Sequence, residues 1–369
     1  MIDKVIEFVK KRAFIIGGVA VIAVALTVAL IVVTSRPSDG KFAGITPPPS
    51  IGLEVDQQPD EPELKPEEVK PKAPTYPLTG LPAPSEEARL ARPLFVKIEN
   101  TPMARPQMGI SSADVVYESL TEAGITRFAC IFQSTIPDEV GPVRSARNME
   151  VSLVPQYDAL FFNSGANSTV LREIAAAGLA DMSHNAASEI YYRVNYREAP
   201  HNLYLSLSKA YNLAAKKGFA TTLDRAHELE FLDEFPNVTP DANLVIVPFS
   251  YSYVAKWQWS AEDKMYYRYM DEWTYDVDGN RRIGTTNLIV IWVPYVPLPN
   301  VLQGQTFGVN MASSGQATLF IAGKRYDGTW ESDGVNPPRF KDASGKSIKL
   351  APGKTWFQVL DIGMQIQVS

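Results

Sequence analysis

Apolar and polar residues alternate along the first half of the chain in the manner of half-buried β-strands. Residues 94–98 form a short apolar run, and residues 115–122 and 125–133 change between apolar and polar types at many steps. The pair Ala123-Gly124 separates the last two segments and is typical of a tight turn. The pattern therefore predicts one strand followed by a β-hairpin.

Helices are predicted where apolar residues recur every three or four positions. The predicted elements are helices over 148–156, 169–177 and 208–217, with a buried strand over 159–163. Ser168 stands where a helix N-cap is expected, while Gly178 and Gly218 follow the second and third helices as stop signals. Because strands and helices follow one another, we expect an α/β domain over residues 77–235.

The second half of the chain has a different pattern. After Pro240, short aromatic and β-branched segments are separated by turn residues, and a long helical period is missing. The predicted strands cover residues 243–248, 253–259, 265–269, 287–293, 317–322 and 356–361. We therefore expect a mostly antiparallel β domain over residues 240–369. Its aromatic residues, such as Trp257 and Trp259, are predicted to lie in the core, with a carbohydrate-stacking surface as the alternative.

The N-terminal region contains an uncharged run of 21 residues, from 13 to 33. As a helix this run would extend about 32 Å, enough to cross a hydrocarbon layer of about 30 Å. Lysines and an arginine precede it, which places the N-terminus in the cytoplasm. We expect a cytoplasmic tail over 1–12, an uncleaved transmembrane signal anchor over 13–34 and an extracellular remainder. A cleaved signal peptide and a buried core helix are the alternatives.

Residues 35–76 connect this anchor to the folded part of the chain. They contain nine prolines among glutamate, aspartate and lysine, and few large apolar side chains. Such a composition cannot bury enough apolar surface to form a core. We expect an extended, disordered linker that holds the folded domains away from the membrane.

Charge and cysteine content exclude several classes of partner. The net charge of −6 provides no basic field for RNA or DNA, so no nucleic-acid partner is expected. Cys130 is the only cysteine, and it is predicted to be a buried, unreactive thiol. The three histidines show no metal-binding spacing. We therefore predict no cofactor and no metal.

Arginines in loops stiffened by glycine and proline are the strongest candidates for a binding site. Arg105 precedes Pro106, Arg127 lies on a predicted strand, and Arg144, Ser145 and Arg147 belong to the run Gly-Pro-Val-Arg-Ser-Ala-Arg at 141–147. If a helix begins near Ser145, its free N–H groups and these guanidinium groups could meet at a phosphate or carboxylate. Pairing of the arginines with Glu99, Asp114, Glu118 and Glu122 is the alternative.

Four further polar residues complete the predicted ligand-binding set. His201 and Asn202 follow Pro200 in a rigid loop, where an imidazole could contact an anion or make a capping hydrogen bond. Asp114 and Glu118 belong to the first strand of the hairpin. On a strand, Glu118 would lie about 13 Å from Glu122, too far for a glycosidase pair.

Several motifs resemble those of the YerB-like bacterial lipoproteins, a family with N- and C-terminal domains of unknown function 3048. The motifs are Pro-Leu-Thr-Gly-Leu at 77–81, Ile-Glu-Asn-Thr at 98–101, Ala-Arg-Pro-Gln at 104–107, Ala-Asp-Val-Val-Tyr-Glu at 113–118, Gly-Ile-Thr-Arg-Phe at 124–128, the run at 141–147, Ala-Pro-His-Asn-Leu-Tyr at 199–204, Asp-Gly-Thr-Trp at 327–330 and Pro-Gly-Lys-Thr-Trp at 352–356. The resemblance implies a membrane-tethered, extracytoplasmic protein with an α/β domain and a β-rich domain. Family members attach through a lipidated cysteine; this chain has none near its N-terminus, so the apolar helix would replace the lipid.

Three functions are compatible with these residues. The first is a membrane-anchored cell-envelope protein that binds an anionic envelope ligand, such as a cell-wall polymer, or a partner protein through an arginine and histidine cleft. The second is a transferase or hydrolase acting on a phosphate-linked glycan, with the arginines bearing charge and Asp114 or Glu118 holding Mg²⁺ or accepting a proton. The third is a scaffold for envelope or division enzymes. Binding or scaffolding is favoured over catalysis because no combination of residues is diagnostic of a reaction.

Overall fold

The computed structural model describes residues 73–270, 277–279, 281–298 and 307–369. No helix within these ranges is long and apolar enough to cross a membrane. The predicted cytoplasmic tail over 1–12, the signal anchor over 13–34 and most of the linker over 35–76 lie outside them. Residues Lys70–Ser369 form one compact unit.

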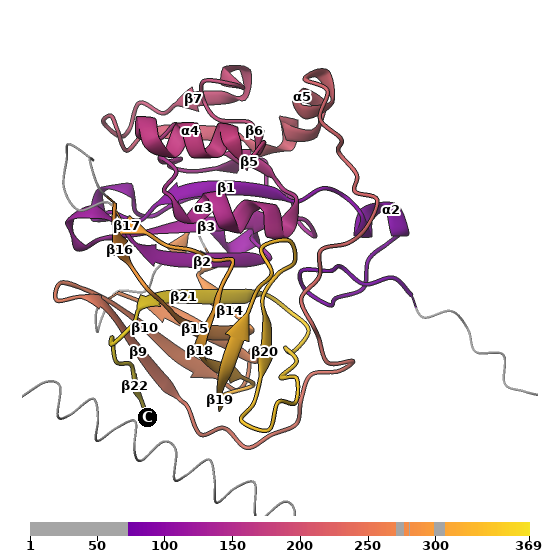
Figure 1. The fold of residues 1–369 in the computed structure, drawn as a ribbon, viewed down its shortest axis with the longest axis vertical. Coiled ribbons are helices and arrows are strands. Elements are labelled where there is room, and N and C mark those ends of the chain that lie inside the picture. Colours follow the sequence, from indigo (N-terminus) through magenta and orange to yellow (C-terminus); the bar gives the residue numbers. More distant parts are fainter. Residues whose placement is uncertain (1–72, 271–276, 280, 299–306) are drawn as a thin grey trace, which may run out of the picture. The chain divides into compact units, whose positions relative to one another are not determined.

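A mixed sheet of ten strands is the central element of the described ranges (Figure 1). Its order is β20-β19-β18-β15-β21-β2-β3-β1-β5-β6. The strands are β1 (Leu94–Glu99), β2 (Val115–Leu120), β3 (Thr126–Phe132), β5 (Leu160–Phe162), β6 (Ala180–Asp181), β15 (Asn287–Val293), β18 (Ser314–Ile321), β19 (Lys324–Glu331), β20 (Arg339–Lys341) and β21 (Thr355–Asp361). Strand β21 lies between β15 and β2 and pairs with both in parallel. Strands from the two halves of the chain are therefore joined edge to edge.

The remaining strands form smaller sheets. A five-stranded sheet has the order β14-β11-β10-β9-β22, and a three-stranded sheet has the order β4-β8-β7. Their strands are β4 (Glu139–Val140), β7 (Tyr191–Arg193), β8 (Leu203–Ser206), β9 (Leu244–Ser250), β10 (Tyr253–Ser260), β11 (Met265–Tyr269), β14 (Gly284–Thr285) and β22 (Gln367–Val368). Two short ribbons pair β12 (Val277–Asp278) with β13 (Arg281–Arg282) and β16 (Val296–Pro297) with β17 (Phe307–Gly308).

The helices are short: α2 (Glu86–Arg89), α3 (Met149–Leu153), α4 (Ser168–Ala176) and α5 (Ala210–Lys216). The described part of the chain is thus a mixed-sheet protein with few helices, whose C-terminal region is mostly antiparallel, as expected. In α4 the side chain of Asn167, rather than that of Ser168, caps the helix by accepting the amide of Val170 at 2.9 Å. The predicted helix over 148–156 divides into α3 and a 3₁₀ turn over Val154–Tyr157, where Pro155 cannot donate an α-helical hydrogen bond.

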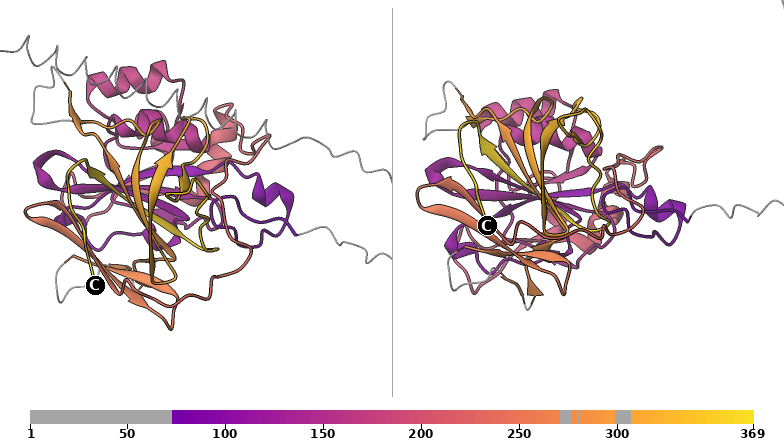
Figure 2. Two further views of the ribbon diagram at one scale, coloured as in Figure 1. Left: turned by 60° about the horizontal axis from the view of Figure 1, so that its bottom comes forward. Right: turned by 90° about the horizontal axis from the view of Figure 1, so that it is seen from below.

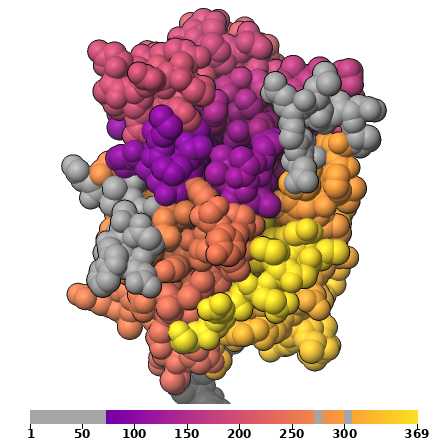
Figure 3. All heavy atoms as spheres, turned by 90° about the vertical axis from the view of Figure 1, so that its left-hand side faces the viewer, coloured from indigo at the N-terminus to yellow at the C-terminus, as the bar shows by residue number. Residues whose placement is uncertain are grey.

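Helix α3 and the 3₁₀ turn that follows it cover one face of the large sheet, and the five-stranded sheet covers the other face (Figure 2). On one face, Tyr117 of β2 stacks on Phe357 of β21, with 4.2 Å between ring centroids, and bonds the hydroxyl of Tyr157 after α3. On the other face, Trp257 of β10 packs edge-on against Trp356 of β21 at 5.0 Å. Neighbouring residues of one strand point to opposite faces, so a single strand can bind both layers. The space-filling view shows the two halves in close contact (Figure 3).

Two tryptophans of the five-stranded sheet lie in the core, whereas Tyr267 and Tyr269 of β11 are partly exposed. Trp257 is fully buried and Trp259 is 9% exposed. Neither residue is available as a stacking surface, so the prediction of core packing is confirmed and the carbohydrate-stacking alternative is wrong at these two positions.

Candidate functional site

Three loops surround the end of β1 and bring part of the predicted site together. The peptide bonds before Pro106, Pro142 and Pro200 are all cis. The loop over 141–147 runs beside β1, because the amide of Arg144 donates to the carbonyl of Lys97 at 2.9 Å. On its other side, the amide of Val143 donates to the carbonyl of Leu203 at the start of β8.

The residues of this region form an arginine cluster, defined here as Arg127, Arg144, Arg147 and His201 with the carboxylates of Glu99 and Glu122. Glu99 ends β1 and lies directly opposite Arg127 of β3 in the antiparallel register. Glu99 Oε2 lies 3.3 Å from Arg144 Nε, and Glu99 Oε1 lies 2.9 Å from His201 Nδ1. Glu99 therefore links the arginine loop to the histidine loop.

Arg147 makes the second ion pair of the arginine cluster. Its Nη2 and Nε donate to Glu122 Oε2 at 2.6 and 3.0 Å, and its Nη1 donates to the carbonyl of Ala146 at 2.8 Å. Although burial opposes it, the hydrogen bond and positive charge of Arg147 lower the pKa of Glu122. The carbonyl of Ser145 accepts from Arg127 Nη1 at 3.2 Å, so the predicted Ser145 contributes its backbone.

Positive charge is in excess within the arginine cluster and the buried pair behind it. Lys97 of β1 and Glu150 of α3 are both fully buried, with their charged atoms 2.5 Å apart. Four cations (Lys97, Arg127, Arg144 and Arg147) thus face three carboxylates (Glu99, Glu122 and Glu150). Burial lowers the pKa of Arg127 to about 9, and the positive charges of Arg147 and Arg144 contribute to this shift. The carboxylates of Glu122 and Glu99 oppose the shift only in part. An added anion would relieve this imbalance.

The arginine cluster reaches water at its rim. The side chains of Arg144, Arg147 and His201 are 23%, 18% and 16% exposed, whereas Arg127 is buried. Beside Arg147 and Glu122, a small pocket of about 10 Å³ is also lined by Phe307. A ligand would therefore touch the cluster from the surface.

The other predicted residues lie outside the arginine cluster. Arg105 donates from Nε to Asn100 Oδ1 at 3.1 Å and also bonds the Tyr253 hydroxyl of β10. Asn202 accepts from Arg193 Nη1 at 2.7 Å and donates to the carbonyl of Val194 at 3.2 Å. These contacts connect elements of the fold.

Glu118 forms a buried ion pair with Arg268, a residue outside the predicted site. Its Oε1 accepts from Arg268 Nη2 of β11 at 2.7 Å, and both side chains are fully buried. Gln358 of β21 donates to the other oxygen at 3.0 Å. The sequence did not predict that Lys97, Glu150 and Arg268 form buried ion pairs. The signal for one of them was Lys97 itself, because a lysine inside the apolar run at 94–98 needs a buried carboxylate nearby.

Asp114 stabilises the end of the hairpin. One carboxylate oxygen accepts the amides of Gln133 and Ser134, each at 2.7 Å, and the other accepts the Ser134 hydroxyl. Burial raises the pKa of Asp114. Among the described residues, no group of three or more His, Cys, Asp or Glu side chains is placed to hold a metal ion.

Replacing Asp114 with alanine is expected to lower the free energy of unfolding by about 1–3 kcal/mol, because buried donors lose their acceptor. Urea unfolding followed by circular dichroism measures the change. Asp114→Asn keeps one acceptor oxygen and should lose less. Equal stability of Asp114→Ala and the unmodified protein would contradict the assigned role.

The fold and the site define a mixed α/β protein with an arginine cluster among the loops that surround the end of β1. Residues 78–220 match the N-terminal domain of a protein family of unknown function, DUF3048, and residues 245–357 match its C-terminal domain. Together the two matches span more than half of the chain, and the chain belongs to this family. The predicted boundary at 235–240 falls between them.

The chain is also similar to YerB of Bacillus subtilis. The protein described as "Putative lipoprotein YerB" of strain 168 is 29% identical over 296 residues, which cover 77% of this chain and 85% of that protein. The crystal structure of YerB from Bacillus subtilis matches with a TM-score of 0.71 and 26% identity, covering 79% of this chain and 99% of that chain. The resemblance inferred from the motifs is confirmed.

Proposed function

We propose that this protein acts at the cell envelope, outside the membrane, and binds an anionic envelope ligand through the arginine cluster. The similarity to a protein described as a lipoprotein supports the location. The apolar run over 13–34 would anchor the chain in the membrane, with the N-terminus in the cytoplasm and the folded part outside. The ligand class is a phosphate- or carboxylate-bearing polymer of the envelope.

The excess of cations over carboxylates is the observation that carries this proposal. Arg127 has a lowered pKa because it is buried beside two further guanidinium groups, and among the described residues its Nε has no hydrogen-bond partner. Buried polar atoms are usually satisfied, and an unsatisfied one marks a place where a ligand can contribute. Guanidinium groups bind phosphate and carboxylate with paired, charge-assisted hydrogen bonds.

The test uses residues 70–369, which form one compact unit, titrated with inorganic pyrophosphate and with purified anionic cell-wall polymer. Arg144→Ala and Arg147→Ala should each weaken binding about tenfold, the effect of losing one charge-assisted contact. Arg172→Ala is the matched control, because Arg172 is an exposed arginine of α4 outside the cluster. Binding that both cluster variants leave unchanged would overturn the proposal. Melting curves establish that each variant is folded.

A further inference from the structure

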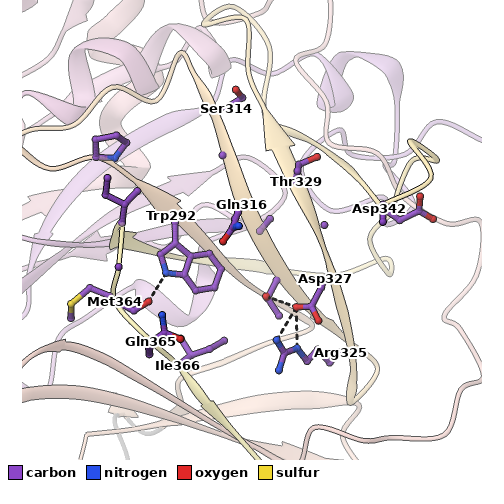
Figure 4. Close-up of a pocket in the computed structure, with 18 residues that line it drawn as sticks. Trp292, Ser314, Gln316, Arg325, Asp327, Thr329, Asp342, Met364, Gln365 and Ile366 are labelled. Carbon is purple, nitrogen blue, oxygen red and sulfur yellow. Dashed lines mark hydrogen bonds and ion pairs between the residues drawn. The ribbon is translucent and has the colours of Figure 1, made fainter. Parts of the chain in front are cut away.

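A second candidate site lies in the C-terminal region, apart from the arginine cluster. A groove of about 1000 Å³ runs along β15, β18 and β19 and is closed on one side by residues 362–366. We call it the C-terminal groove; Figure 4 shows the side chains that line it. Its volume is at the upper end of the range of ligand sites.

The floor of the C-terminal groove is a polar face of the large sheet. Gln316 of β18 lies opposite Thr329 of β19, and Thr318 lies opposite Asp327. Because side chains alternate along a strand, these four residues point to the same face. On β18, the intervening residues Ala317 and Leu319 point to the opposite face and are buried. The alternation along β18 and β19 therefore places their polar side chains on the face that forms the groove floor.

Trp292 supplies an aromatic surface beside these polar groups. Its indole Nε1 donates to the carbonyl of Met364 at 2.8 Å. This hydrogen bond fixes the ring against residues 362–366, which form one side of the groove. Figure 4 shows the indole ring broadside to the groove, next to Gln316. The electron-rich face of an indole attracts the polarised C–H groups of a sugar ring.

The charged groups that line the C-terminal groove already have partners, which suits an uncharged ligand: the Asp342 carboxylate accepts the amides of Ser344 and Lys346. Arg325 is neutralised by Asp327, whose Oδ1 lies 2.9 Å from Arg325 Nη2. Among the described residues, none hydrogen-bonds the side-chain amides of Gln316 and Gln365. Each amide offers two donor hydrogens and an acceptor oxygen, which match hydroxyl groups that both donate and accept. The backbone of the floor is already paired within the sheet, so it cannot accept an added peptide strand.

We propose that the C-terminal groove binds a neutral oligosaccharide, with a sugar ring stacked on Trp292 and its hydroxyl groups bonded to Gln316, Thr329 and Gln365. This site is separate from the arginine cluster and does not depend on the function proposed for it.

The test is a titration of residues 70–369 with three soluble neutral tetrasaccharides: chitotetraose, cellotetraose and maltotetraose. Tryptophan fluorescence and saturation-transfer NMR report binding. At least one sugar should bind; Trp292→Ala should weaken it about tenfold or more, and Gln316→Ala about threefold, as expected for an aromatic anchor and a single polar contact. Glu331→Ala is the matched control, because Glu331 is an exposed residue of β19 outside the groove.

Two outcomes would overturn the proposal. One is the absence of binding to all three sugars. The other is binding that persists unchanged in Gln316→Ala and Thr329→Ala, two exposed positions whose substitution leaves the core intact. Arg144→Ala should leave sugar binding unchanged while weakening anion binding, so the two sites can fail independently.

Discussion

Replacing Arg268 with methionine is expected to lower the free energy of unfolding by about 3–5 kcal/mol, because the carboxylate of Glu118 would remain buried without its cation. Both side chains are fully buried, and they connect β11 of the small sheet to β2 of the large sheet. The guanidinium also lies over the rings of Phe128 and Trp356, at 5.4 and 5.9 Å from their centroids. Loss of this pair therefore weakens the contact between the two layers.

Chemical denaturation followed by fluorescence measures this change. The control is Arg339→Met, which removes an exposed ion pair with Glu230 and should cost below about 1 kcal/mol. Adding Glu118→Gln to the Arg268→Met variant removes the unpaired charge and should recover part of the loss. A loss in Arg268→Met no larger than that of the control would show that the pair does not hold the layers together.

Replacing Lys97 with methionine is expected to destabilise the protein by a similar amount, about 3–5 kcal/mol. Lys97 and Glu150 are fully buried, and the ammonium lies 2.5 Å from the carboxylate. Burial lowers the pKa of Lys97, and the charges of Arg127 and Arg147 add to this effect while Glu150 opposes it. The lysine is thus held charged chiefly by Glu150. Its removal leaves that carboxylate, among the residues that the structure describes, with one neutral donor, the amide of Arg147.

Thermal and urea unfolding of Lys97→Met measure the loss. Lys324→Met is the control, because Lys324 pairs with Asp241 on the surface, where both side chains are more than one-third exposed. The double variant Lys97→Met with Glu150→Gln should be more stable than Lys97→Met alone. Should the single variant match the Lys324→Met control, the buried pair would have no structural role.

Local patterns predicted every described strand of five or more residues except β19, and the locations of α3, α4 and α5, but of the shorter described strands they predicted only β5. The hairpin of β2 and β3 follows from alternation and from the Ala123-Gly124 turn, and Ala123 and Gly124 do adopt positive φ angles of 61° and 71°. Strand β19 was not predicted, because its one fully buried side chain, Trp330, gives a weak apolar pattern. The exposed polar residues of β19 form part of the groove floor because β19 pairs with β18, which supplies the rest of that polar surface.

Five of the nine predicted site residues lie together in space. Arg127, Arg144, Ser145, Arg147 and His201 meet around Glu99 and Glu122, whereas Arg105, Asp114, Glu118 and Asn202 bond other parts of the fold. The sequence showed which residues carry charge, but ion pairs such as Glu118 with Arg268 join positions 150 apart in the chain. Such pairing depends on register between strands that are distant in sequence.

The sequence alone determined the uncharged N-terminal run, the proline-rich segment, the strand periodicity and the family, because each depends on residue type and local order. Only the tertiary structure decided that β21 joins the two halves in one sheet, that Lys97 and Arg268 are buried opposite carboxylates, and that a polar groove lies beside Trp292. The physical reason is that alternation fixes which face a side chain takes, whereas its partner depends on which strands pair and in which register.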